Sequence, residues 1–112
     1  MTACKRGDVV LVGFVLSDES GEKLRPTVVV SSPEYHRSRQ EVIVMAVTGK
    51  TARRPYGAHL LSEWKKAGLL SPSLATGILR TIQQTMIRRK LGTLSKSDMD
   101  AVDRSLGRTL GL

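Results

Sequence analysis

The sequence predicts a mainly β protein with some helix, folded as a small β barrel with a helix packed at its C-terminus. Two observations support this fold class. The first half of the chain holds three valine-rich runs of strand length, and the C-terminal segment changes to helical spacing. With 112 residues the chain is long enough for one modest core, so we expect a single domain over residues 1–112.

The three valine-rich runs are expected to be strands because each is bounded by polar or turn residues. They are Asp8–Val15, Thr27–Ser32 and Glu41–Thr48. Their apolar residues are mostly continuous, which is typical of strands that are covered on both faces, as in a small or strongly curved barrel. Ala75–Gln83 is a candidate for a further strand, and Ala58–Trp64 contains a candidate for a short one.

Three polar segments are expected to connect these strands as loops. Leu16–Leu24 is charged, contains Gly21 and lacks apolar anchors, which predicts mobility. Ser32–Gln40 is the second loop. The third, Gly49–Gly57, carries three basic residues among its glycines and proline.

The C-terminal segment is predicted to be a helix because four apolar residues recur at three- and four-residue steps. They are Met99, Val102, Leu106 and Leu110. Ser95 or Ser97 can serve as the N-cap, and the spacing of Ser95 and Asp98 is that of a capping box with Asp in place of Glu. Acids near the start and arginines near the end suit the helix dipole.

The charge distribution favours an anionic partner. The formal net charge is +8, and Glu63 is the only acid between Val42 and Ser97, a segment rich in lysine and arginine. Such an excess attracts polyanions, and nucleic acid is the commonest one in a cytoplasm. The alternative is a basic surface that only aids solubility.

Several other classes of protein are disfavoured. One cysteine allows neither an intrachain disulfide nor a cysteine-based zinc site, and the N-terminus lacks an apolar signal segment, so the cytoplasm is the expected location. No stretch approaches the ~20 apolar residues of a membrane helix, so no membrane partner is expected. His36 and His59 lack acids or cysteines at ligand spacing, and no phosphate loop or nucleophile elbow is present, so no metal or cofactor is expected.

A candidate anion site follows from the ends of two strands. Arg25 precedes one predicted strand and Thr48 ends the next. If these strands pair antiparallel, both side chains lie at the same rim of the barrel. A guanidinium beside a hydroxyl suits a phosphodiester, and the basic loop after Thr48 would add phosphate contacts. The alternative is an ordinary strand-edge arginine whose head is solvated or paired with a carboxylate.

The ordered series of segments resembles a known family. "KRGDVVLVGF", "RPTVVVSS" and "VIVMAVTGK", followed by "AGLLSPS", "LRTI" and "RKLGTLSKSDMDAVDRSL", are similar to the MazF/PemK (Kid-like) toxins of type II toxin–antitoxin systems over roughly residues 5–110. The resemblance implies an SH3-like barrel, a homodimer, and a metal-independent endoribonuclease that cuts single-stranded RNA at short motifs. A cognate acidic antitoxin is the implied partner.

The resemblance also implies site residues. Arg25 and Thr48 match the family's catalytic pair, and Leu16–Leu24 matches its flexible cover of the active site. The implied reaction is attack of the 2′-hydroxyl on the adjacent phosphorus, leaving a 2′,3′-cyclic phosphate or 3′-phosphate and a 5′-hydroxyl. Further RNA contacts are expected from Gly21, Lys23, Lys50, Arg53, Arg54, Arg80 and Thr81.

The sequence departs from the family pattern in one place. Many members carry an Asp-Gln pair before the "RTI" stretch and an acid after it, where this chain has Gly77, Ile78 and Gln83. We therefore expect an altered RNA sequence preference. Two other functions stay open, namely a toxin of related fold that poisons DNA gyrase and a catalytically silent RNA-binding barrel.

Overall fold

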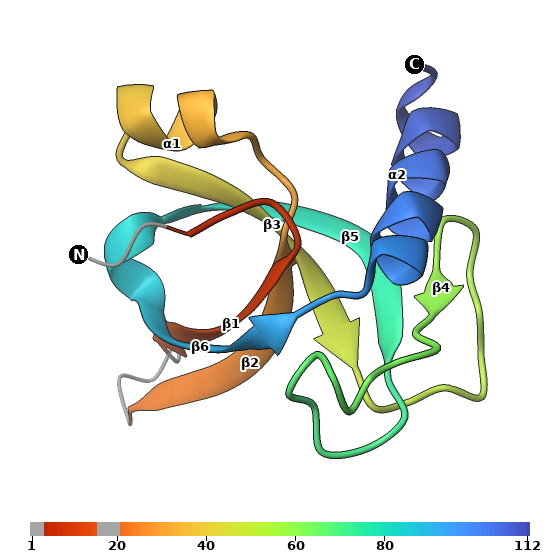
Figure 1. Ribbon diagram of the computed structural model, residues 1–112. Helices are drawn as coiled ribbons and strands as arrows, with labels where there is room; N and C mark the ends of the chain where they lie inside the picture. The colour runs from red at the N-terminus through yellow and green to blue at the C-terminus, as the bar shows by residue number, and fades with distance from the viewer. Residues whose placement is uncertain (1–3, 16–20) are drawn as a thin grey trace.

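The computed structural model describes residues 4–15 and 21–112, which form one antiparallel sheet and two α-helices (Figure 1). In chain order the elements are β1 (Asp8–Val15), β2 (Glu22–Val29), α1 (Pro33–Ser38), β3 (Glu41–Thr48), β4 (His59–Leu60), β5 (Leu74–Gln83), the 3-10 turn η1 (Gln84–Met86), β6 (Ile87–Thr93) and α2 (Lys96–Leu110). The strand order in the sheet is β4-β5-β3-β2-β1-β6. The prediction of a small, mainly β barrel with a C-terminal helix is confirmed.

The predicted strands are confirmed, with changed bounds for two of them. β1 and β3 have the predicted ends, and β5 starts one residue earlier than expected. β2 instead runs over Glu22–Val29, so the bounds predicted for this strand and for the loop before it are wrong. The reason is that pairing with β1 continues to Val15 and Glu22, and backbone pairing does not require apolar side chains. Of the predicted mobile loop Leu16–Leu24, residues 16–20 lie outside the described residues.

Two elements differ from the sequence-based expectation. The predicted loop Ser32–Gln40 contains α1, which begins because the Ser32 side chain accepts a hydrogen bond from the Tyr35 N–H and Pro33 occupies the first turn. β6 was not anticipated, because three consecutive cations, Arg88 to Lys90, interrupt its apolar residues. It is a strand because it pairs antiparallel with β1.

The sheet is covered on both faces, as the continuous apolar runs predict. Alternate side chains of the central strands enter two separate cores. One core, around Val9, Val28 and Met45, is covered by α2 and the segment after β4. The other core, around Val10 and Val44, lies on the opposite face of the strands.

The sheet curls, and its two edges come from β4 and β6 (Figure 1). The segment between β4 and β5 packs against β6, where a Cβ added to Gly92 would lie only 2.6 Å from the backbone of Ala67. Within the described residues the barrel is thus completed by packed backbone rather than by a ladder between its edges. This close approach requires glycine at position 92.

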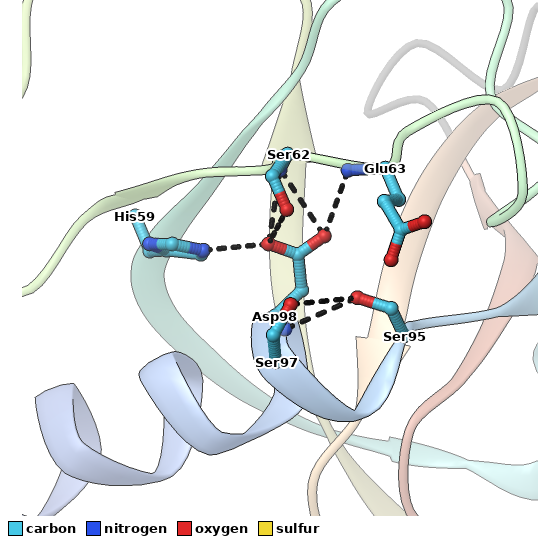
Figure 2. A network of polar contacts seen from close by, with 6 residues as sticks. All are labelled: His59, Ser62, Glu63, Ser95, Ser97 and Asp98. Carbon is cyan, nitrogen blue, oxygen red and sulfur yellow. Dashed lines mark hydrogen bonds and ion pairs between the residues drawn. The ribbon is translucent and has the colours of Figure 1, made fainter.

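A buried carboxylate fixes the start of α2. Ser95 is the N-cap and accepts a hydrogen bond from the Asp98 N–H, as predicted, but Asp98 does not complete a capping box. Its carboxylate instead accepts hydrogen bonds from the N–H groups of Ser62 and Glu63, the Ser62 hydroxyl and His59 Nε2 (Figure 2). Burial by itself raises the pKa of Asp98, but these hydrogen bonds outweigh it and hold that pKa at about 2.

The helical stripe of α2 is confirmed in part. Val102 is buried in the core, and Met99 and Leu106 pack against it, whereas Leu110 is 54% exposed in the last turn. None of the described helices is long and apolar enough to cross a membrane.

Candidate functional site

An open groove of about 700 Å³ lies on one face of the sheet, across β1, β2, β3 and β5. Side chains alternate between the two faces of a strand, and one face of each of these strands contributes most of the lining. Its lining includes Phe14 from β1, Lys23 and Arg25 from β2, Ala46 and Thr48 from β3, and Thr76, Ile78 and Arg80 from β5. Most of the groove surface is apolar, and four cations are among its lining residues.

The predicted pair, Arg25 and Thr48, lies in this groove. β2 and β3 are antiparallel, as expected, and their ladder pairs Thr27 with Ala46. Arg25 comes two residues before Thr27, and Thr48 comes two residues after Ala46, so both side chains project from the same face and at the same end of this strand pair. Arg25 lies within β2, whereas the sequence pattern predicts it at the start of the strand.

Arg25 and Thr48 have different surroundings. The Arg25 side chain is exposed, and its hydrogen bond within the described residues goes from Nη1 to the Leu24 carbonyl at 3.4 Å. The ion pairs found in the described parts of the chain do not include Arg25. The Thr48 hydroxyl accepts a hydrogen bond from the Lys50 N–H at 3.2 Å, so its oxygen is held in place and its proton is free for another acceptor. The pair can accordingly hold an anion.

Arg80 is a third cation of the groove and is positioned by an aromatic ring. Its guanidinium carbon lies 4.8 Å from the centroid of Phe14. Such a cation–π contact restrains the side chain while leaving most of its N–H donors available. Lys23 and Lys50 also line the groove. Four of the predicted cations thus line one groove, and their role as a binding site stays a prediction.

The remaining predicted RNA contacts lie outside the groove lining. Gly21 precedes β2 and is exposed, and Arg53 and Arg54 are exposed in the segment between β3 and β4. Thr81 pairs with Ile43 and follows Arg80 in β5, so its side chain projects from the opposite face. The roles of these four residues in RNA binding stay predictions.

Sequence reasoning missed other groove residues, among them Phe14, Thr76 and Ile78. The available signal for the last two was Gly77, because a glycine inside a strand pattern is typical of a bulge. β5 does bulge there, since β3 pairs Met45 with Leu79 and Val47 with Ala75. One residue of β3 is thus opposite three residues of β5.

An ion pair holds the outer end of β2 to the far edge of the sheet. The Arg88 Nε and Nη2 donate to the Glu22 carboxylate at 2.8 and 2.5 Å, and this hydrogen bonding lowers the pKa of Glu22. The pair neutralises an acid on the strand that carries Lys23 and Arg25.

In the described part of the chain, no three His, Cys, Asp or Glu residues gather as metal ligands would.

Comparison with known families identifies the chain. Residues 5–110 match the family described as PemK-like, MazF-like toxin of type II toxin-antitoxin system. The chain belongs to this family. The match spans both the strands that build the groove and the C-terminal helix, which agrees with the resemblance seen in the sequence.

Solved structures share the fold of this MazF-like toxin. It is similar to a MazE-MazF structure (Form-II) from Deinococcus radiodurans, with a TM-score of 0.83 and 18% identity, covering 100% of this chain and 99% of that one. It is also similar to an endoribonuclease in complex with its cognate antitoxin from Mycobacterial species, with a TM-score of 0.77 and 20% identity over 98% of this chain and 97% of that one. At such identities the likeness establishes the fold.

Proposed function

We propose that this MazF-like toxin is a cytoplasmic endoribonuclease that cuts single-stranded RNA at short sequence motifs without a metal ion. The observation that supports this most directly is the position of Arg25 and Thr48 on one face of the groove, among further cations. The structural relatives include a protein described as an endoribonuclease. The net charge of +8 favours a polyanionic substrate.

The proposed reaction is a transesterification at phosphorus. The 2′-oxygen of the substrate forms a bond to the adjacent phosphorus, the bond from phosphorus to the 5′-oxygen breaks, and a proton is transferred from the 2′-hydroxyl to the leaving oxygen. The products are a 2′,3′-cyclic phosphate, which hydrolysis can open to the 3′-phosphate, and a 5′-hydroxyl. DNA is not a substrate because it lacks the 2′-hydroxyl nucleophile.

Arg25 and Thr48 have distinct roles in this reaction. The Arg25 guanidinium is always charged and donates to the phosphoryl oxygens, on which negative charge increases in the transition state. The Thr48 hydroxyl, held by the Lys50 N–H, donates a hydrogen bond that positions the phosphate. A free arginine is a very weak base, so its main contribution is electrostatic.

The decisive experiment incubates the purified protein with a long RNA in EDTA and maps the ends of the products. Cleavage with 5′-hydroxyl ends is expected, and Arg25→Ala should reduce it by about a hundredfold or more, as loss of one electrostatic donor does. Thr48→Val, which removes only the hydroxyl, should slow cleavage while the protein keeps its melting transition. Arg104→Ala is a matched control, because Arg104 is exposed on α2 away from the groove.

The proposal fails if RNA stays intact over a large excess of protein, and this result would favour the gyrase-binding or silent RNA-binding alternatives. It also fails if Arg25→Ala and Arg104→Ala cleave equally well. If Thr48→Val loses its melting transition, Thr48 has a structural role instead.

We also propose an acidic antitoxin and a homodimer as the partners. The groove presents Lys23, Arg25, Lys50 and Arg80, and an acidic segment that folds on binding would cover them. Among the structural relatives, MazE-MazF of Deinococcus radiodurans and a mycobacterial endoribonuclease are described together with a partner of this kind. Size-exclusion chromatography of the protein alone and with its antitoxin tests both assemblies.

A further inference from the structure

The bulge in β5 brings an apolar side chain into the groove. Between Ala75 and Leu79 the strand has Thr76, Gly77 and Ile78, where β3 has the single residue Ala46. Gly77 has a φ of +83°, a conformation that L side chains rarely adopt. A Cβ at Gly77 would also lie 2.9 Å from the Gly57 carbonyl oxygen. The bulge therefore depends on glycine at this position.

The bulge is stabilised by hydrogen bonds of its own. The Thr76 hydroxyl donates to the Ala46 carbonyl at 2.8 Å, which replaces the ladder bond that the bulge removes. The same hydroxyl oxygen accepts from the Ile78 N–H at 3.1 Å. One side chain thus bonds to a backbone group of each strand. Ile78 is held in a defined position rather than on a loose loop.

The Ile78 side chain is exposed where an isoleucine is usually covered. It is 60% exposed, although it lines the groove beside Arg80 and across β3 from Arg25. Phe14 and Ala46 add to this apolar surface, and four cations line the same groove. An apolar surface between phosphate-binding cations matches a nucleotide, whose base has apolar faces and whose backbone is anionic.

The geometry points to Ile78 as the surface on which one RNA base packs. The side chain holds this base by apolar contact and does not distinguish among the four bases by hydrogen bonding. This inference rests on the proposed RNA substrate. It adds how the protein contacts one nucleotide of the cleavage motif. Isoleucine has neither a donor nor an acceptor in its side chain, so it cannot distinguish the hydrogen-bonding edges of bases. The cleavage motif should consequently contain one degenerate position, at the nucleotide that packs on Ile78.

The test measures binding with an RNA that the protein cannot cut. The probe is a single-stranded 2′-O-methyl oligonucleotide that contains the mapped cleavage motif, or a random-sequence pool if none is found. Its affinity is measured by fluorescence anisotropy. Ile78→Ala should weaken binding about tenfold, while Ile78→Leu, which keeps the apolar surface, should restore most of the affinity. Leu70→Ala is the matched control, since Leu70 is 99% exposed but does not line the groove.

A scan of the probe locates the base. When each nucleotide in turn is made abasic, one position should lower the affinity of the wild type but not that of Ile78→Ala. Exchanging the four bases at that position should change wild-type affinity by less than about threefold. Ile78→Gln, which adds a donor and an acceptor, should create a preference among the four bases there.

Three results would overturn the inference. They are equal affinities for Ile78→Ala and Leu70→Ala, an abasic scan that is the same in wild type and Ile78→Ala, and strong discrimination by the wild type at the nucleotide located. Because the probe is uncleavable, binding that depends on Ile78 supports the inference even if no RNA is cut. Cleavage that does not depend on Ile78 supports only the proposed function.

Discussion

At the scale of single residues, the chain uses its charged groups in two ways. Arg25 is exposed in the groove and is not paired with a carboxylate of the described residues, which keeps its donors available for a phosphate. Asp98 is nearly fully buried and accepts hydrogen bonds from the segment that follows β4 (Figure 2). The first arrangement suits binding and the second suits stability, because a buried carboxylate must be satisfied by internal donors.

The lowered pKa of Asp98 leads to a prediction about stability in acid. Its pKa is about 2 in the folded protein against an ordinary value of 3.8, so the carboxylate stabilises the fold above pH 3.8 and loses that contribution as the pH falls toward 2. The shift corresponds to about 2 kcal/mol. Asp98→Asn should be less stable than the wild type at pH 5. When urea unfolding is measured from pH 5 down to pH 2, the free energy of unfolding should fall less for Asp98→Asn than for the wild type.

The control for this prediction is Asp100→Asn, two residues along the same helix. Asp100 is half exposed and pairs with Lys96, so its removal should leave the pH dependence close to that of the wild type. If Asp98→Asn keeps the full pH dependence, the hydrogen bonds of Figure 2 do not stabilise the ionised carboxylate.

At the scale of elements, irregular backbone positions the site. The strands of the sheet are regular over most of their length, and the bulge in β5 is the point where a side chain is redirected into the groove. Gly77 permits it by its positive φ. The segment between β3 and β4 lies against the bulge, through the carbonyl of Gly57, and therefore depends on the same glycine.

Two glycine substitutions should have opposite effects. Gly77→Ala should lower the free energy of unfolding by about 2 kcal/mol or more, because it combines backbone strain with crowding against Gly57. Gly107→Ala should raise it by about 0.5–1 kcal/mol, since Gly107 lies within α2 and a Cβ there meets nothing within 4 Å. Thermal and urea denaturation of both variants measure the difference, and a neutral Gly77→Ala would contradict the need for the bulge.

At the scale of the whole molecule, four of the cations line the groove, whereas others are paired with acids. The net charge is +8, and several of the cations are paired with acids away from the groove, such as Arg6 with Asp103 and Arg88 with Glu22. The groove cations face an apolar surface instead. The four groove cations give the site a positive field that attracts a polyanion.

The affinity for single-stranded RNA should therefore depend on salt through the four groove cations. If each contacts one phosphate, the slope of log affinity against log salt is about −3, so binding weakens about 50-fold between about 50 and about 200 mM salt. Anisotropy titrations with an uncleavable RNA measure this slope. Lys50→Ala should reduce its magnitude by about 0.7, whereas Lys66→Ala, an exposed lysine paired with Glu63, should not change it. A flat salt dependence would contradict phosphate contact by this groove.

The sequence alone predicts the three strands β1, β3 and β5 and the terminal helix, with Ser95 or Ser97 as its cap. These features follow from local patterns of apolar residues and from caps, which act over a few residues. The start of β2 and the whole of β6 were decided by pairing with β1, which provides backbone partners for segments whose side chains are polar.

The hydrogen bonds of Asp98 and the exposure of Ile78 were likewise decided only by tertiary structure. Asp98 meets Ser62, and Thr76 meets Ala46, across separations of 36 and 30 residues. No pattern along the chain reports such contacts, because they depend on which backbone groups the folded sheet leaves without a partner.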